Sequence, residues 1–231
     1  MALTIREKPM PQSKYDIKCP YTMVPRFIVI HNTAGYASAE NEIAYMQSND
    51  NQVSFHYAVD ETEAILGSPL TRNCWHAGDG PSGEGNRYGI SIEICRSMTG
   101  GELFAKAEEN GAELTAKILL EKGWGLDRVK THKEFSPWGK NCPHRTLELG
   151  WDRFLIMVKH KMDLLNGVSP TSAGTPGDGN VPHDWARIAV EKAIKKGILK
   201  GSSPTNPNYR LNDPVTREEV LVFIDRALDG R

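Results

Sequence analysis

The sequence predicts an α/β protein, with a mixed central β-sheet flanked by helices and a small helical module at the C-terminus. Short apolar runs with a period of two alternate with longer segments whose apolar residues recur at helical spacing. A stretch rich in Gly, Pro, Ser and Thr then precedes two further amphipathic helices. We therefore expect a main domain over residues 1–165, a flexible linker over residues 166–182 and a C-terminal module over residues 183–231.

The first half of the main domain is expected to contain three strands and one helix. The strands are predicted over residues 27–35, 53–61 and 63–70, and the helix over residues 38–50. Period two along the first strand places Phe27, Val29 and His31 on one face. Ser38, with a Glu two residues later, is a typical start for the helix.

The second half begins with the most regular strand of the chain. In the segment YGISIEICRS, residues 88–97, apolar and other residues alternate, which places Ile90, Ile92 and Ile94 on one face. Its other face carries Ser91, Glu93 and Cys95. Amphipathic helices are predicted over residues 104–123 and 147–165.

The charge balance and the lengths of the apolar runs exclude several classes of protein. Lys and Arg number 28 against 29 Asp and Glu, so no global field favours nucleic acid or an anionic membrane as a partner. No run approaches the ~18 apolar residues of a membrane span, and the N-terminus lacks the apolar core of a signal peptide. We expect a protein made in a cytosol, with no membrane insertion and a local binding site. The sequence does not indicate an oligomeric state.

One turn-rich loop, THKEFSPWGKNCPHRTL over residues 131–147, concentrates groups that can bind a metal. A hydrolytic zinc site takes three protein ligands and leaves one position to water. His31, at a strand end, and His132 and Cys142 from this loop can supply three ligands, because Pro137 and Gly139 let the backbone fold back. Scattered His and Cys are also common as purely structural residues, so the spacing alone leaves both interpretations open.

Two further residues favour a catalytic site. Lys140 lies two positions before Cys142, so in an extended segment both side chains point the same way and an ammonium lies beside the metal. It can stabilise an oxyanion there; alternatively it is a solvated loop lysine. Glu93 lies on the polar face of a central strand, where an unpaired carboxylate is costly. A catalytic role explains it, and a salt bridge is the alternative.

Five motifs in this order, HNTAG, SFHYAVDE, CWHAGDG, SIEIC and HKEFSPWGKNCPHR, strongly resemble the zinc-dependent N-acetylmuramoyl-L-alanine amidases of the type-2 family. The likeness covers about residues 15–165 and is strongest to endolysins of phages with Bacillus-like hosts. It implies a fold of the type-2 amidase or peptidoglycan-recognition kind, Zn²⁺ held by His31, His132 and Cys142, and catalytic roles for Glu93 and Lys140. Some relatives carry a catalytic Tyr where this chain has Phe55, so here Glu93 carries that role alone.

The resemblance also implies the reaction. We expect hydrolysis of the amide between N-acetylmuramic acid and L-alanine, with Glu93 as general base and then general acid and with Lys140 and zinc stabilising the oxyanion. Trp75 and His76, in a Gly-rich loop, are expected to contact the substrate, although His76 could instead brace the loop. His56 is expected to be a satisfied core histidine or to support a ligand.

Two other function classes are open. A non-catalytic peptidoglycan-recognition protein of the same fold typically lacks the Cys ligand, which this chain has. A structural zinc site in an unrelated binding protein would need four protein ligands and leaves Glu93 and Lys140 unexplained.

The C-terminal module contains DWARIAVEKAIKKGILKGSS and then NYRLNDPVTREEV, and these segments resemble one repeat of an S-layer-homology module. Such modules bind secondary polymers of Gram-positive cell walls, often as three repeats, whereas this chain has one. Trp185 and Arg217 are the candidates for wall contact, with a module-core Trp and a helix-start ion pair as alternatives. The whole sequence thus predicts a lytic enzyme that accumulates in the host bacterial cytoplasm and then acts on peptidoglycan and, through this module, on a wall polymer.

Overall fold

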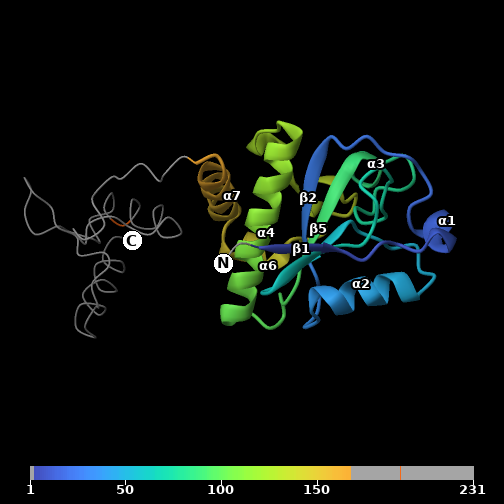
Figure 1. The fold of residues 1–231 in the computed structure, drawn as a ribbon, viewed down its shortest axis with the longest axis horizontal. Helices are drawn as coiled ribbons and strands as arrows, with labels where there is room; N and C mark the ends of the chain where they lie inside the picture. Colours follow the sequence, from blue (N-terminus) through green and yellow to red (C-terminus); the bar gives the residue numbers. More distant parts are fainter. Residues whose placement is uncertain (1–2, 168–192, 194–231) are drawn as a thin grey trace, which may run out of the picture. The chain divides into compact units, whose positions relative to one another are not determined.

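A computed structural model describes residues 3–167 and Ala193 of the chain. All of the expected C-terminal module except Ala193, and all but the first two residues of the expected linker, lie outside the described residues. Trp185 and Arg217 are among the residues not described. The described part is built on one six-stranded sheet with helices on both of its faces (Figure 1). None of the helices within it is long and apolar enough to cross a membrane.

The sheet is mixed, as the sequence predicts. Its strand order is β1-β4-β3-β5-β2-β6, with β3 and β4 antiparallel and every other neighbouring pair parallel. The strands are β1 (Thr4–Glu7), β2 (Phe27–Asn32), β3 (Tyr57–Val59), β4 (Glu63–Leu66), β5 (Gly89–Ile94) and β6 (Val129–Thr131). Both β2 and β5 are central, and their register places His31 opposite Glu93. Two polar side chains from distant motifs therefore meet at the carboxyl end of the sheet.

The helices vary widely in length. They are α1 (Tyr15–Lys18), α2 (Ala39–Ser48), α3 (Glu84–Tyr88), α4 (Gly101–Lys122), α5 (His132–Phe135), α6 (His144–Leu149) and α7 (Trp151–Leu165), with 3-10 turns at Gln12–Lys14 and Leu126–Arg128. Ser38 caps α2 as expected, its hydroxyl accepting a hydrogen bond from the Asn41 N–H.

Two apolar layers lie against the sheet. On one face lie α4 and α7 (Figure 1). Their buried residues Phe104 and Phe154 belong to one apolar cluster with Ile30, Ile92 and Ile94 of β2 and β5. The approach of α4 is close because a Cβ at Gly111 would lie 2.9 Å from a side-chain atom of Ile94. The other face has a smaller cluster that contains Ile43 of α2. That second face also carries His31 and Glu93, so polar side chains lie beside the smaller apolar cluster.

Several element boundaries differ from the prediction. The helix expected over residues 147–165 is two helices, because Gly150 has a φ of 113°, which interrupts helical geometry between α6 and α7. The strand expected over 53–61 is regular only at Tyr57–Val59. The short strands β1 and β6 were not predicted, because three or four residues carry too little periodicity to be recognised.

Candidate metal centre and catalytic site

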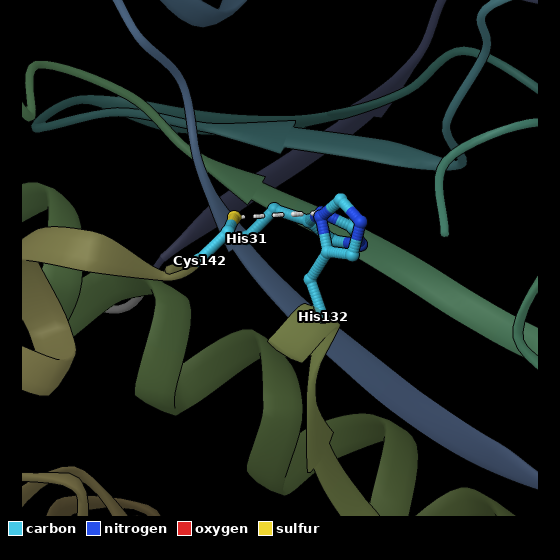
Figure 2. Close-up of side chains that lie close together, drawn as sticks. All are labelled: His31, His132 and Cys142. Atoms are coloured by element: carbon cyan, nitrogen blue, oxygen red, sulfur yellow. Dashed lines mark hydrogen bonds between the residues drawn. The ribbon is translucent and has the colours of Figure 1, made fainter. Parts of the chain in front are cut away.

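Three side chains from separate elements converge at the carboxyl end of β2. His31 closes this strand, His132 opens α5, and Cys142 lies in the loop between α5 and α6 (Figure 2). Their ligand atoms all lie within 4.8 Å of one another, and Cys142 Sγ is 3.8 Å from His31 Nδ1. All three residues are buried. The structure thus brings together the three candidate ligands that the sequence suggested.

Local hydrogen bonds hold His132 in place. Strand β6 pairs with β2 and leads directly into α5, whose start is fixed by a capping box between Thr131 and Glu134. The Lys133 N–H donates to the carbonyl of Cys142 at 2.9 Å, which ties the third ligand's backbone to the start of α5. His132 and Cys142 are therefore neighbours although nine residues separate them in the chain.

Asn32 connects the same region to the end of β2. Its side-chain oxygen accepts hydrogen bonds from the N–H groups of Arg145 and Thr146 at 2.9 and 3.0 Å. These are donors in the first turn of α6, where helix N–H groups lack partners within the helix. Asn32 follows His31 directly, and α6 begins two residues after Cys142. These bonds therefore hold His31 and Cys142 near each other.

The two histidines each face the cluster with Nδ1. His31 Nε2 lies 3.0 Å from His76 Nδ1, and His132 Nε2 lies 3.1 Å from the Ala77 carbonyl oxygen. Within the described residues, the buried Nδ1 of His132 has no hydrogen-bond partner. A buried nitrogen with a free lone pair, beside a thiol and a second imidazole, fits a bound metal ion.

Burial sets the protonation states of these groups. It lowers the pKa of His31 well below its usual value, with His76, His132 and Lys140 acting in the same direction. Burial and then Lys140 lower the pKa of His132 to about 4. Burial raises the pKa of the Cys142 thiol to about 12, and the nearby Glu93 adds to this shift. Near neutral pH both imidazoles are neutral and can bind a metal, whereas Cys142 must lose a proton to do so.

Glu93 lies beside the cluster on β5. Its Oε1 is 3.7 Å from His31 Nδ1, and its side chain is 17% exposed. Burial raises the pKa of Glu93 to about 8; Glu42 contributes in the same direction and Lys140 opposes it. No salt bridge to Lys or Arg involves Glu93 in the described part of the chain, so the alternative of a simple ion pair receives no support. A carboxylate with a pKa near neutrality is suited to proton transfer.

Lys140 is exposed on the loop between α5 and α6. The loop is turned at this point, because the Cys142 N–H donates to the Lys140 carbonyl at 2.8 Å and the Gly139 N–H donates to Ser136. The extended segment assumed for Lys140 and Cys142 is therefore wrong in detail. Lys140 nevertheless acts electrostatically on His31, His132 and Glu93, which places its charge close to the site.

Comparison with known proteins identifies the family. The model of the N-acetylmuramoyl-L-alanine amidase family matches residues 21–145, and the S-layer homology domain model matches residues 181–221. The amidase CwlA of Bacillus subtilis (strain 168) is 40% identical over 99% of this chain and 79% of its own length. The chain belongs to the N-acetylmuramoyl-L-alanine amidase family. The amidase XlyB of the same organism is 43% identical over 79% of this chain and 57% of its own length.

Solved structures of amidases confirm the fold. PlyL is 47% identical, with a TM-score of 0.65 over 68% of this chain and 97% of the PlyL chain. The PlyG catalytic domain is 46% identical, with a TM-score of 0.66 over 75% of this chain and 100% of the PlyG chain. The mixed sheet with flanking helices is thus the type-2 amidase fold predicted from the sequence.

Two clefts of the amidase domain border the cluster of His31, His132 and Cys142. The larger, of about 1010 Å³, is lined by residues that include Trp75, His76, His132 and Trp138. The smaller, of about 360 Å³, is lined by residues that include Glu42, Phe55, Glu93 and Cys142. Lys140 and Val53 border both. His132 is therefore reached from the larger cleft, and Glu93 and Cys142 from the smaller one, whereas His31 lines neither.

The other predicted residues of the amidase fall into two groups. Trp75 lines the larger cleft, half-buried, with its indole N–H donating to the Ile17 carbonyl at 2.9 Å. His76 borders the same cleft but is 9% exposed, and its Nδ1 contacts Nε2 of His31. His56 is fully buried and hydrogen-bonded to Ser91 and to the Arg72 carbonyl, as expected for a satisfied core histidine.

Sequence reasoning missed the residues that hold the amidase ligands in place. Asn32 and the Ala77 carbonyl act through a single side chain or a backbone atom, and no residue pattern marks either. Buried Lys18 was also missed, because it stands in a short polar segment without periodicity. The Gly-rich loop around His76 is the one available signal, and from the sequence it favours a substrate contact and a loop-bracing hydrogen bond equally.

Proposed function

We propose that this chain hydrolyses the amide bond between N-acetylmuramic acid and L-alanine in bacterial peptidoglycan, with Zn²⁺ held by His31, His132 and Cys142. The observation that carries the proposal is the meeting of three ligand atoms within 4.8 Å, with the Glu93 carboxylate 3.7 Å from one of them. Two imidazoles and a thiolate form a donor set that favours zinc over magnesium or calcium. The family to which the chain belongs supplies the substrate.

Zinc bound at this site supplies a Lewis acid that polarises a carbonyl and makes a water molecule more acidic. Glu93 accepts the proton of the attacking water and then returns it to the departing amine of L-alanine. Lys140, at the mouth of both clefts, holds negative charge on the carbonyl oxygen as the tetrahedral state forms. His31 and His132 stay neutral and serve as ligands throughout.

The experiment follows the turbidity of purified Gram-positive cell walls together with the appearance of N-terminal alanine. We expect clearing and new alanine amines with the native protein, and neither with chelator nor with Glu93→Gln. A non-catalytic recognition protein would instead sediment with the walls and release no amines. That result, with zinc present, would refute the proposed activity.

We further propose the organisation predicted from the sequence. Residues 1–165 form the catalytic domain, 166–182 the linker and 183–231 a module that binds a secondary cell-wall polymer, with Trp185 and Arg217 as the residues to test. The match of the S-layer homology model to residues 181–221 supports the last part. Accumulation in the host cytoplasm before action at the cell wall remains a prediction.

A further inference from the structure

The segment from Cys74 to Asn86 lies directly behind the metal ligands. It brings two hydrogen-bonding groups to the two histidines: the His76 ring reaches His31 Nε2, and the Ala77 carbonyl reaches His132 Nε2. These groups come from consecutive residues. One short segment therefore contacts the far nitrogen of both imidazoles.

The segment is itself fixed by side-chain hydrogen bonds. Asn86 Oδ1 accepts from the N–H groups of both His76 and Ala77 at 2.8 Å, and its Nδ2 donates to the Gly80 carbonyl at 3.1 Å. Asp79 accepts from the N–H groups of Gly85 and Asn86 at 2.7 and 3.2 Å. Five bonds within about ten residues give the His76 ring a defined position rather than that of a free loop side chain.

The contact with His31 fixes which nitrogen can bind a metal. A neutral imidazole has one N–H donor and one acceptor nitrogen. His31 Nδ1 faces Cys142 Sγ at 3.8 Å, so a metal there requires the proton of His31 to lie on Nε2. That N–H then donates to His76 Nδ1 across 3.0 Å, and the proton of His76 lies on its own Nε2.

We propose that His76 is a positioning residue of the metal centre: its Nδ1 accepts the Nε2–H of His31 and holds His31 in the tautomer and orientation that offer Nδ1 to zinc. This inference rests on the zinc site of the proposed function and replaces the expected substrate contact as the main role of His76. The burial of His76, which is 9% exposed, agrees with a contact made within the protein.

Two substitutions in the full chain test this role. His76→Leu introduces an apolar side chain of similar bulk and removes the hydrogen-bond acceptor. His76→Asn instead places an amide oxygen near the position of Nδ1. Zinc affinity is measured by competition with a chromophoric chelator. We expect His76→Leu to bind zinc about 10–100-fold more weakly than the native protein, and His76→Asn to recover most of the loss.

Circular dichroism melts of the metal-free proteins separate positioning from folding. The proposal expects the two variants to have similar melting temperatures without zinc and to differ once zinc is added. If both bind zinc like the native protein while His76→Leu raises KM on cell walls alone, His76 is a substrate contact and the proposal is overturned.

A spectroscopic measurement covers the case in which His76→Leu fails to fold. In the ¹⁵N spectrum of the zinc-loaded native protein, His31 is expected to be protonated at Nε2 with its Nδ1 bound to the metal; the opposite tautomer refutes the proposal. Failure of the proposed function looks different, because the native protein would then bind no zinc or would bind it and release no alanine from walls.

Discussion

Two charged groups of the amidase domain, the buried Lys18 and the partly buried Glu93, differ sharply in how they are satisfied. Lys18 is 0% exposed, and its ammonium donates to Asn49 Oδ1 at 2.9 Å and to the carbonyls of Asn51 and Val53 at 2.6 and 3.0 Å. Glu93 has only the 3.7 Å approach of His31 Nδ1 among the polar contacts of the described residues. Burial lowers the pKa of Lys18 and raises that of Glu93 to about 8.

The difference supports a structural role for Lys18 and the catalytic role proposed for Glu93. Removing a charge from water is costly, and three well-placed acceptors offset much of that cost for Lys18. These bonds fix the segment 49–53, whose residues line both clefts. No comparable set of donors surrounds Glu93, so its carboxylate can take up and release a proton.

The largest expected effect comes from Glu93→Gln. The substitution keeps the shape of the side chain but removes the proton acceptor, so we expect alanine release to fall by about 10²–10⁴-fold. The melting temperature should be unchanged or higher, because a partly buried, poorly paired carboxylate has been removed.

Glu42→Gln is the matched control for this test. Glu42 is also partly buried and lines the same smaller cleft, but the proposed reaction does not use it. We expect this variant to keep most of its activity. An equal loss in both variants would show that negative charge in the cleft, and not a base at Glu93, supports the reaction.

A smaller loss is expected from Lys140→Met. Removing one group that stabilises an oxyanion costs about 10²-fold in favourable cases, and kcat should fall more than KM rises. Zinc affinity should not fall, because the Lys140 cation acts against positive charge at the two ligand histidines. Lys133→Met is the control, because it removes an exposed cation from the neighbouring α5 and should leave kcat unchanged. A similar loss of kcat in the Lys140 and Lys133 variants would point to general attraction of the anionic wall.

Lys18→Met is expected to act on stability instead of chemistry. It leaves a buried amide oxygen and two carbonyls without their donor, and we expect about 2–3 kcal/mol less free energy of unfolding in urea. Lys14→Met, which removes a surface ion pair with Asp50, should have a much smaller effect. If Lys18→Met were as stable as the native protein but inactive, the contrast between the two charged groups would collapse.

The sequence predicted four of the six strands, and His31 and Glu93 on two of them, because these features depend on periodicity. Alternation along residues 88–97 separated Glu93 from the Ile face, and the apolar run before His31 marked a strand end; both are local patterns. The pairing of His31 with Glu93 depends on the register of two strands that are distant in the chain, and alternation alone does not set a register.

Other parts of the site depend on single hydrogen bonds. The closeness of His132 and Cys142 follows from one backbone bond at Lys133 and from the Asn32 side chain. The turn-forming residues of the loop predicted that the two could converge, but they do not specify these bonds. The role of Lys18 depends on three acceptors in an irregular segment, which no periodic pattern describes.

The smallest effect is a difference in proton release when zinc binds to the metal-free protein. Cys142, with a pKa of about 12, loses its thiol proton on binding, and the neutral histidines lose none. Glu93, with a pKa of about 8, is mostly protonated at pH 7, and the zinc charge beside it lowers that pKa and expels a second proton.

Calorimetry in buffers with different ionisation enthalpies measures the release. At pH 7 the native protein should release about one proton more than Glu93→Gln. The excess should vanish near pH 9, where Glu93 has already ionised in the metal-free protein. An equal release from both proteins at pH 7 would mean that Glu93 keeps one protonation state, ionised or protonated, when zinc binds, and the metal charge would then not convert it into the base. An excess that is lost as the pH rises would instead show that the metal charge itself converts Glu93 into the base.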